Sequence, residues 1–190
     1  MTETILSIFL GIGLASATGF RVFLPMFAMS LASYFKVFEL NESFQVIAEF
    51  PALITLGIAT IIEIFGYYFP FIDNLLDTIA TPLAAVAGTV VMASTLVNLP
   101  TEMTWILAII AGGGTASAMQ GMTSLTRLAS SVKTAGLGNP IVATAETGTA
   151  TAMSALAIFA PIIAIIFVVI LIGIVFFLYK KFRKTINPLN

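Results

Sequence analysis

Four charged side chains lie within apolar stretches of the sequence and are the residues best placed to do chemistry. They are Arg21, Glu63, Asp77 and Glu146. If those stretches cross a membrane, an ionisable group inside one is costly and is by default a candidate for binding or proton transfer. A carboxylate in a dry site takes up a proton more readily than one in water, which suits proton coupling. A cluster of carboxylates and threonine hydroxyls would instead suit Na⁺ or Mg²⁺.

Three of these charges are predicted to meet near the middle of the membrane. We expect Glu63 and Glu146 to bind a coupling cation or proton there, and Arg21 to bind an anionic group or to act as counter-ion. The structural alternative is that Arg21 pairs with a carboxylate and only locks the helices together. The sequence has no His and no Cys. Any metal ion would therefore need oxygen ligands, and the sequence leaves open whether one binds.

Further polar residues complete the predicted ion- or substrate-binding set. Thr147 follows Glu146, and Asn139 belongs to a Gly-Asn-Pro segment that forms either a plain loop or a helix start whose N–H groups face an anion. Asp77 lies four residues after Asp73, so the two share one face of a helix. Helix capping in water is the favoured interpretation for Asp73 and the alternative for Asp77.

The composition indicates that these residues belong to an all-α membrane protein. The chain has 190 residues, of which 59% are hydrophobic and 9% charged, and its mean hydropathy is +1.08. Soluble domains have roughly 25% charged residues, so a water-soluble fold could not cover its surface with this composition. We expect a single transmembrane domain over residues 1–190, in contact with the lipid bilayer. The net charge of -1 gives no reason to expect nucleic acid as a partner.

The apolar stretches predict about six transmembrane segments. They cover residues 5–35, 51–69, 75–97, 103–128, 141–160 and 161–179. The first is too long for one upright span of about 20 residues, and Gly19 and Pro25 interrupt it, so we expect a kinked or broken helix. Residues 141–179 are also too long for one span, and Pro161 is the natural break. Residues 36–50 predict a loop or an interfacial helix, and residues 130–140 a polar loop.

An internal repeat relates the two halves of the chain. Residues 11–17 match residues 112–118, and residues 57–60 match residues 148–151 in the same order, with Pro70 aligned to Pro161. With three segments in each half, about 1–98 and about 103–180, the halves would insert with opposite orientations. Such a 3+3 inverted repeat with Pro- and Gly-broken helices is the architecture of many secondary transporters.

Positive charges predict the orientation of the segments. Four basic residues follow the last apolar stretch, namely Lys180, Lys181, Arg183 and Lys184. By the positive-inside rule we expect the tail 180–190 in the cytoplasm. An even number of crossings then places the N-terminus in the cytoplasm as well, and Arg127 and Lys133 fall on the same side.

Three motifs carry a resemblance to a known family. They are Gly19-Phe-Arg21-Val-Phe-Leu-Pro25, Asp73-Asn-Leu-Leu-Asp77, and Gly136-Leu-Gly138-Asn139-Pro140 followed by Glu146. With them the chain resembles the bacterial and plastid family catalogued as DUF4126, over most of its length up to Pro161. It departs where family members often carry His-Ala-Leu-Lys and this chain has Ser117-Ala118-Met119-Gln120. Any role of that His or Lys is therefore absent. The resemblance implies a membrane protein and no established activity. We expect the chain in the bacterial inner (cytoplasmic) membrane.

Together these features predict a small secondary transporter or permease, coupled to protons or a cation, that moves a small solute or ion. The alternative is a structural or accessory subunit of a membrane complex. An enzyme is not expected: without His or Cys it would need an aspartate pair, and Asp73 and Asp77 lack the motifs of aspartyl intramembrane proteases. We predict no cofactor, and no nucleotide-binding motif is present. The sequence leaves open the substrate, the coupling ion, the direction of transport, and whether the chain forms a homo-oligomer or joins a larger complex.

Overall fold

The structure is a computed structural model in which residues 2–186 are described. Within that range it describes all side chains except those of residues 70, 71, 74, 175, 176 and 178–186. The predicted basic cluster, made of Lys180, Lys181, Arg183 and Lys184, therefore lies outside the described side chains. The predicted cytoplasmic tail 180–190 stays a prediction.

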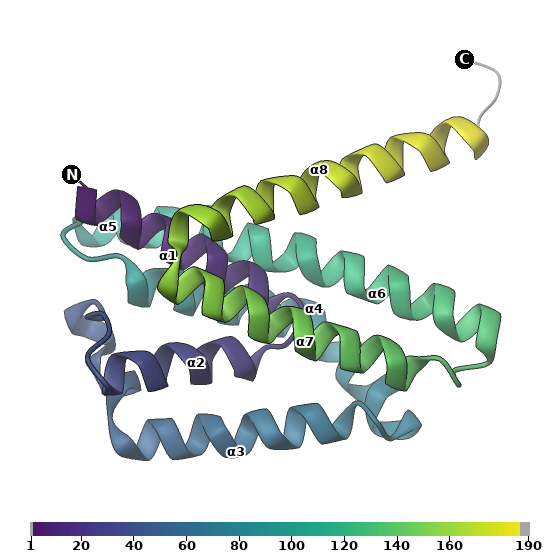
Figure 1. The fold of residues 1–190 in the computed structure, drawn as a ribbon, viewed down its shortest axis with the longest axis horizontal. Coiled ribbons are helices and arrows are strands. Elements are labelled where there is room, and N and C mark those ends of the chain that lie inside the picture. Colours follow the sequence, from purple (N-terminus) through teal and green to yellow (C-terminus); the bar gives the residue numbers. More distant parts are fainter. Residues whose placement is uncertain (1, 187–190) are drawn as a thin grey trace.

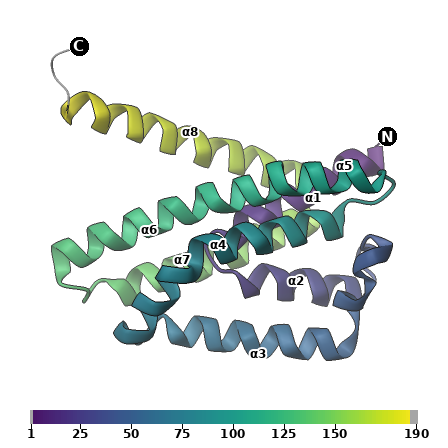
Figure 2. The same cartoon turned by 180° about the vertical axis from the view of Figure 1, so that it is seen from behind.

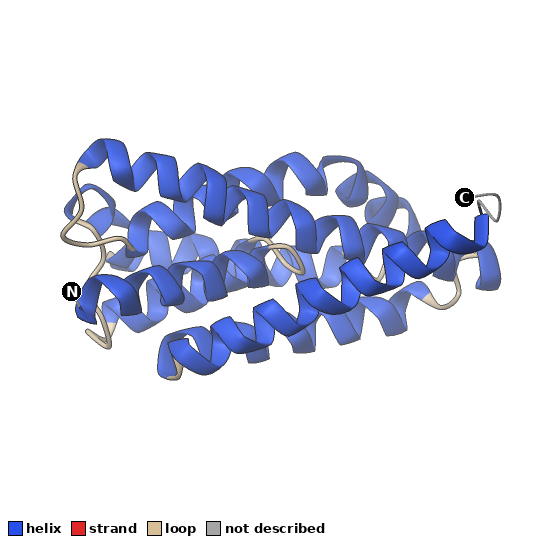
Figure 3. Cartoon of the chain, turned by 90° about the horizontal axis from the view of Figure 1, so that it is seen from above, coloured by secondary structure: helices blue, strands red, loops and turns tan. Residues whose placement is uncertain are grey.

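The described chain consists of helices joined by short connections (Figures 1 and 3). In order they are α1 (Thr2–Thr18), α2 (Phe23–Tyr34), the 3-10 helix η1 (Glu42–Ala48), α3 (Phe50–Gly66), α4 (Pro70–Thr95), α5 (Thr101–Leu107), the π-helical segment η2 (Ala108–Gly113), α6 (Gly114–Thr134), α7 (Asn139–Phe159) and α8 (Pro161–Ile186). Pro51, Pro70 and Pro140 stand in the first positions of their helices, where a missing N–H costs no hydrogen bond. The predicted all-α class is confirmed.

Several of these helices are suited to a membrane. Within the described residues, 75–95 of α4 and the whole of α7 are long and apolar enough to cross a membrane. The helices η1 and α3 make a third candidate if they are counted as a single span despite the 65° bend between them. Large apolar side chains lie exposed on the outer helices, among them Ile58, Ile62 and Phe65 of α3. An apolar exterior of this kind is expected where the solvent is lipid. The two or three spans do not confirm the predicted six.

The first predicted segment forms a helical hairpin, which we call the α1–α2 hairpin. The predicted interruption near Gly19 is present: α1 ends at Thr18, and the N–H groups of Gly19 and Arg21 donate to the carbonyls of Ser16 and Ala17. From there α2 runs back toward the end at which α1 began (Figures 1 and 2). Pro25 causes no kink, because it lies in the first turn of α2.

The hairpin changes the expected topology. Because it returns the chain to the end from which it came, the start of α1 and the end of α8 lie at opposite ends of the bundle (Figure 1). The prediction that both termini lie on the same side does not fit this arrangement. The inverted repeat is not confirmed either: α3 and α7 run in opposite directions, as do α4 and α8, but α1 and the α5–α6 helix run in the same direction (Figure 1).

Small residues let the central helices approach one another closely. A Cβ added to Gly88 of α4 would lie 2.4 Å from Cβ of Ala116 and 2.8 Å from the carbonyl oxygen of Gly112. A Cβ added to Gly19 would meet the carbonyl oxygen of Ala116 at 2.6 Å. The hairpin turn and α4 are thus both packed against the start of α6, and this packing positions the residues of the site.

We expect Gly88→Ala to destabilise the protein by about 1–3 kcal/mol, because overpacking forces backbones apart. Gly121→Ala on α6 is the matched control, since a Cβ there meets nothing within 4 Å. It should leave the free energy of unfolding unchanged or raise it slightly, because alanine is the better helix former. Denaturant titration of both purified variants checks this. A Gly88→Ala protein as stable as the control would show that the α4–α6 contact is not close.

Candidate functional site

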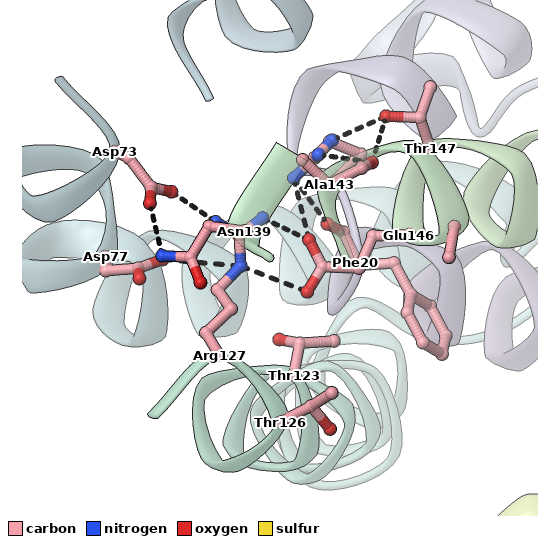
Figure 4. Close-up of polar contacts among 12 residues, drawn as sticks. Phe20, Asp73, Asp77, Thr123, Thr126, Arg127, Asn139, Ala143, Glu146 and Thr147 are labelled. Carbon is pink, nitrogen blue, oxygen red and sulfur yellow. Dashed lines mark hydrogen bonds and ion pairs between the residues drawn. The ribbon is translucent and has the colours of Figure 1, made fainter. Parts of the chain in front are cut away.

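The site is centred on Arg127, a buried arginine of α6. Its Nε and Nη2 donate to the two oxygens of Glu146 on α7, and its Nη1 donates to Asp73 on α4 (Figure 4). Its Nε also lies 3.7 Å from Oδ1 of Asp77. The planar guanidinium has five donors in a fixed fork and matches a carboxylate with two parallel bonds. One cation thereby serves three carboxylates from two helices.

A second buried arginine, Arg21, reaches the same glutamate from the turn of the α1–α2 hairpin. Its Nη1 lies 3.2 Å from Oε2 of Glu146. Its Nε donates to Oγ1 of Thr147 at 3.0 Å, and its Nη2 donates to the carbonyl of Ala143 at 2.8 Å (Figure 4). All three acceptors belong to α7. Glu146 therefore bridges the two guanidiniums, and the hairpin turn is fastened to α7.

The ring of Tyr67, just after α3, is shared by the two arginines. The Cζ atoms of Arg21 and Arg127 lie 4.0 Å and 4.1 Å from the ring centroid. Each contact is a cation–π interaction, which strengthens where water is excluded, and Tyr67 is itself buried. Tyr67 therefore brings α3 into the same ion network.

Asn139 extends the network toward the end of the bundle at which α7 begins. Its Nδ2 donates to Oδ2 of Asp73 at 3.0 Å and lies within hydrogen-bond distance, 3.2 Å, of the Ser131 hydroxyl (Figure 4). The polar loop predicted over residues 130–140 is shorter in the structure: α6 ends at Thr134, and α7 starts at Asn139. Asn139 is thus a helix-start residue, one of the two alternatives the sequence offered, and its side chain is bound to a carboxylate.

Asp77 is the carboxylate with the fewest partners. Its side chain keeps 28% of its exposure, whereas those of Asp73 and Arg127 keep 3% each. Its Oδ1 is buried, and among the described residues it accepts no hydrogen bond. An oxygen without a hydrogen bond is less well stabilised as an anion than the bonded oxygens of Asp73 and Glu146. Asp77 is therefore the least satisfied carboxylate of the network.

Glu63 lies apart from Glu146, at the start of α2. Its Oε1 accepts the N–H of Val22 at 2.7 Å, and its Oε2 accepts the N–H of Phe23 at 3.0 Å. The first N–H groups of a helix have no partner within the helix and carry partial positive charge, so a carboxylate is well placed there. Glu63 and Glu146 thus have different hydrogen-bond partners, the start of α2 for Glu63 and the two arginines for Glu146.

A polar hollow lies at the opposite end of the bundle. It measures about 1030 Å³ and is lined by residues of the connection before α3 and of the turn after α4, among them Lys36, Glu39, Glu42, Glu49 and Asn98. Its lining residues Phe38 and Ala48 also pack against a buried apolar cluster. That cluster, the apolar layer, consists of Leu10, Leu14, Met29, Leu40, Val91, Ala157 and Ala164.

The charges of the site do not balance. Arg21 and Arg127 supply two positive charges, whereas Asp73, Asp77 and Glu146 supply three carboxylates and Glu63, beyond Arg21, a fourth. Among the described residues no group of three or more carboxylates is arranged to hold a metal ion. The carboxylates face guanidiniums and N–H groups rather than one another. Among the described residues, the carboxylates of the site thus outnumber its guanidiniums.

The structure brings most of the predicted residues together. One network contains Arg21, Asp77, Asn139, Glu146 and Thr147. Glu63 bonds instead to the first N–H groups of α2, next to Arg21 in the sequence. The sequence interpretation missed Arg127 and Tyr67, and it favoured a solvent-exposed cap for Asp73, which is buried.

Arg127 was missed because the predicted fourth segment ended at residue 128, which placed this arginine at the water. In fact α6 continues to Thr134. A signal was present in the sequence: Gln120, Thr123 and Arg127 are spaced three and four residues apart, and this polar stripe is the buried face of α6.

Comparison with known proteins gives a family and no relative of known activity. A family model described as "Domain of unknown function (DUF4126)" matches residues 8–181. Neither the curated proteins nor the solved structures contain a match to the chain. The matched range contains every residue of the ion network and the whole α1–α2 hairpin except its first turns. The chain therefore belongs to the DUF4126 family.

Proposed function

We propose that this protein is a small secondary transporter or permease coupled to protons, and that it moves a small solute or ion. One observation carries the proposal: two buried arginines and three carboxylates form a network at the turn of a helical hairpin inside an apolar bundle. Discontinuous helices that end beside charged groups are typical of substrate and ion sites in secondary transporters. Buried charges of this kind mark ion and proton pathways.

The distribution of polar and apolar regions supports the proposal. The ion network reaches from the hairpin turn to the end of the bundle where α6 meets α7. The polar hollow opens at the other end, and the apolar layer lies beneath it. An alternating-access cycle needs such a barrier between two polar regions. We propose that the protein lies in a bacterial inner membrane, and that the end of the bundle at which α6 ends and α7 begins faces the cytoplasm.

A structural or accessory subunit is the second candidate, and the binding of Arg21 favours it. Nε, Nη1 and Nη2 of Arg21 all bind groups of α7, so the network locks the hairpin to the bundle. A lock of this kind needs no proton or solute. The two functions differ in whether the network responds to pH.

We expect Asp77→Asn to remove the pH dependence of stability. In the wild type a proton on Asp77 removes the cost of burying a carboxylate oxygen that accepts no hydrogen bond among the described residues, and it relieves the repulsion from Asp73 and Glu146. Stability should therefore rise as the pH falls. Asparagine is neutral at every pH, so the variant should show a flat profile at the stability that the wild type reaches in acid. The measurement is the apparent melting temperature of purified protein between about pH 5 and pH 8, with Na⁺, K⁺ or Mg²⁺ present.

Glu102→Gln, which changes an exposed carboxylate of α5, is the control and should keep the wild-type profile. A shift with one cation that Asp77→Asn abolishes would identify cation coupling in place of proton coupling. A wild type without response to pH or cations would favour the structural subunit.

A further inference from the structure

The two helices of the α1–α2 hairpin are shorter than the core of a membrane is thick. α1 has 17 residues and α2 has 12, whereas the candidate spans on α4 and α7 have 21 each. At 1.5 Å per residue the hairpin helices measure about 26 Å and about 18 Å, against a hydrocarbon core of about 30 Å. α2 is therefore too short to carry the chain across a membrane.

The turn of the hairpin lies inside the protein. Gly19 and Arg21 are buried. The guanidinium of Arg21 bonds to Ala143 and Glu146 of α7, four and seven residues after α7 starts at Asn139 (Figure 4). At 1.5 Å per residue these partners lie about 6–11 Å along the helix from its start. The turn thus ends short of the end of the bundle at which α7 begins.

Both outer ends of the hairpin lie at the other end of the bundle, beside the polar hollow. α2 leads directly into Lys36 and Glu39, which line the hollow. On α1, Ile8 packs into the same apolar cluster as Phe44 and Leu99, and Leu99 also lines the hollow. The start of α1 and the end of α2 lie at one end of the bundle in both views (Figures 1 and 2). The chain therefore enters and leaves the hairpin from one side.

The part of the hairpin between its outer ends and its turn is apolar. Leu10 and Leu14 of α1 and Met29 of α2 belong to the apolar layer and are at most 7% exposed. The hydroxyls of Ser16 and Ser30, which are buried as well, donate to backbone carbonyls. Water that entered here would meet few polar groups, so this part of the hairpin resists its passage.

We propose that the α1–α2 hairpin is a re-entrant barrier: it enters and leaves the membrane on the side of the polar hollow, and it closes the ion network toward that side. The chain then crosses the membrane with α3, α4, the α5–α6 helix, α7 and α8, so its two ends lie on opposite sides. The network meets water from the end at which α6 ends and α7 begins, through Asp77, whose side chain keeps 28% of its exposure.

The proposal goes beyond the transport function and does not require it, because a structural subunit could contain the same barrier. In a transporter, the barrier determines which side of the membrane exchanges protons with the network in this structure.

Cysteine labelling tests the path of the hairpin. The chain has no cysteine, so single cysteines can be introduced without any other change. Glu3→Cys at the start of α1, Lys36→Cys after α2 and Lys133→Cys near the end of α6 are at exposed positions. The probe is a membrane-impermeant maleimide, applied to right-side-out and to inside-out membrane vesicles. We expect Glu3→Cys and Lys36→Cys to be labelled from one side only, and Lys133→Cys from the other side only.

A single crossing by residues 5–35 gives a different pattern. Glu3→Cys would then be labelled together with Lys133→Cys, from the side opposite to Lys36→Cys, and this result would overturn the proposal. Labelling of each variant in detergent is the control, because all three cysteines should react there.

Two further cysteines test the barrier itself, with a small cationic methanethiosulfonate as the probe. Thr18→Cys is a small change at the buried end of α1, and Asp77→Cys places a thiol at the partly exposed edge of the network. Asp77→Cys should react only from the side that labels Lys133→Cys. Thr18→Cys should show a complete loss of labelling from both sides until the protein is unfolded. If Asp77→Cys does not fold, Ser131→Cys beside Asn139 replaces it.

Reaction of Thr18→Cys from the side of the hollow would overturn the barrier. Failure of the network cysteine to react from the Lys133 side would overturn the assigned access.

The labelling pattern and the pH profile can fail separately. Glu3→Cys and Lys36→Cys on one side, with a wild type that does not respond to pH, would retain the barrier and reject proton coupling. The two cysteines on opposite sides, with a pH profile that Asp77→Asn flattens, would retain proton coupling and reject the barrier.

Discussion

Arg127→Met is expected to destabilise the folded protein by about 3–5 kcal/mol, the range found when one partner of a buried ion pair is removed. Methionine fills much of the volume of the arginine but leaves Glu146 and Asp73 buried without their shared donor. It also removes one cation from the ring of Tyr67. Denaturant titration in detergent, followed by circular dichroism, measures the loss.

Two further variants show whether the loss of stability in Arg127→Met comes from the missing charge or from the missing geometry of the guanidinium. Arg127→Lys keeps the positive charge but cannot bind both oxygens of Glu146 and Asp73 at once, so it should recover only part of the stability. Lys133→Met changes an exposed cation in the last turn of the same helix and should cost less than about 0.5 kcal/mol. If Arg127→Met proved no worse than Lys133→Met, Arg127 would not be bonded as described.

Glu146→Gln is expected to have a comparable effect, also about 3–5 kcal/mol, for the opposite reason. Glu146 is the one carboxylate that both arginines contact among the described residues. Without the charge of Glu146, the Arg21 guanidinium keeps only neutral acceptors, among them Thr147 and the carbonyl of Ala143. Arg127 keeps Asp73 and the 3.7 Å contact to Asp77. Thermal unfolding of the purified variant, with Glu102→Gln as the exposed control, gives the measurement.

The pair Arg21→Met and Glu146→Gln makes this prediction more specific. Because each single change leaves an unpaired charge, the double variant should be more stable than the sum of the two losses predicts, with a coupling of about 1–3 kcal/mol. Additive losses would mean that Arg21 and Glu146 do not act as a pair.

Most of the helices could be predicted from the sequence, because proline and apolar length determine them. α3, α7 and α8 begin at Phe50, Asn139 and Pro161, within two residues of the predicted starts. α4 begins at Pro70, five residues before the predicted start at 75. Apolar length and breaks do not indicate the direction in which the chain leaves a break. The segment 5–35 was therefore correctly divided near Gly19, while its return as a hairpin was not predicted.

The site was predicted in part for a similar reason. A lone charge in an apolar run, such as Arg21 or Glu146, is conspicuous, and the sequence indicated both. Arg127 stands in a helix whose serines and threonines make it resemble a segment end. The spacing of Gln120, Thr123 and Arg127 indicates one helix face, but the partners of Arg127 on α4 and α7 come from contacts that no local pattern contains. The partner of Glu63 is a pair of backbone N–H groups, which have no sequence signature.

The π-helical segment η2 determines which way Arg127 faces. A π-helical turn acts like one residue inserted into an α-helix, and one residue rotates all that follows by about 100° about the helix axis. α5 and α6 are therefore out of phase with each other. Gly112 can face α4 while Arg127, four turns later, points at Glu146. Loss of one residue between Ala108 and Gly113 would rotate that arginine away from its carboxylates with every side chain of the network still present. The number of residues in this one helical turn therefore determines whether Arg127 reaches its carboxylates, just as the identity of the charged residues does.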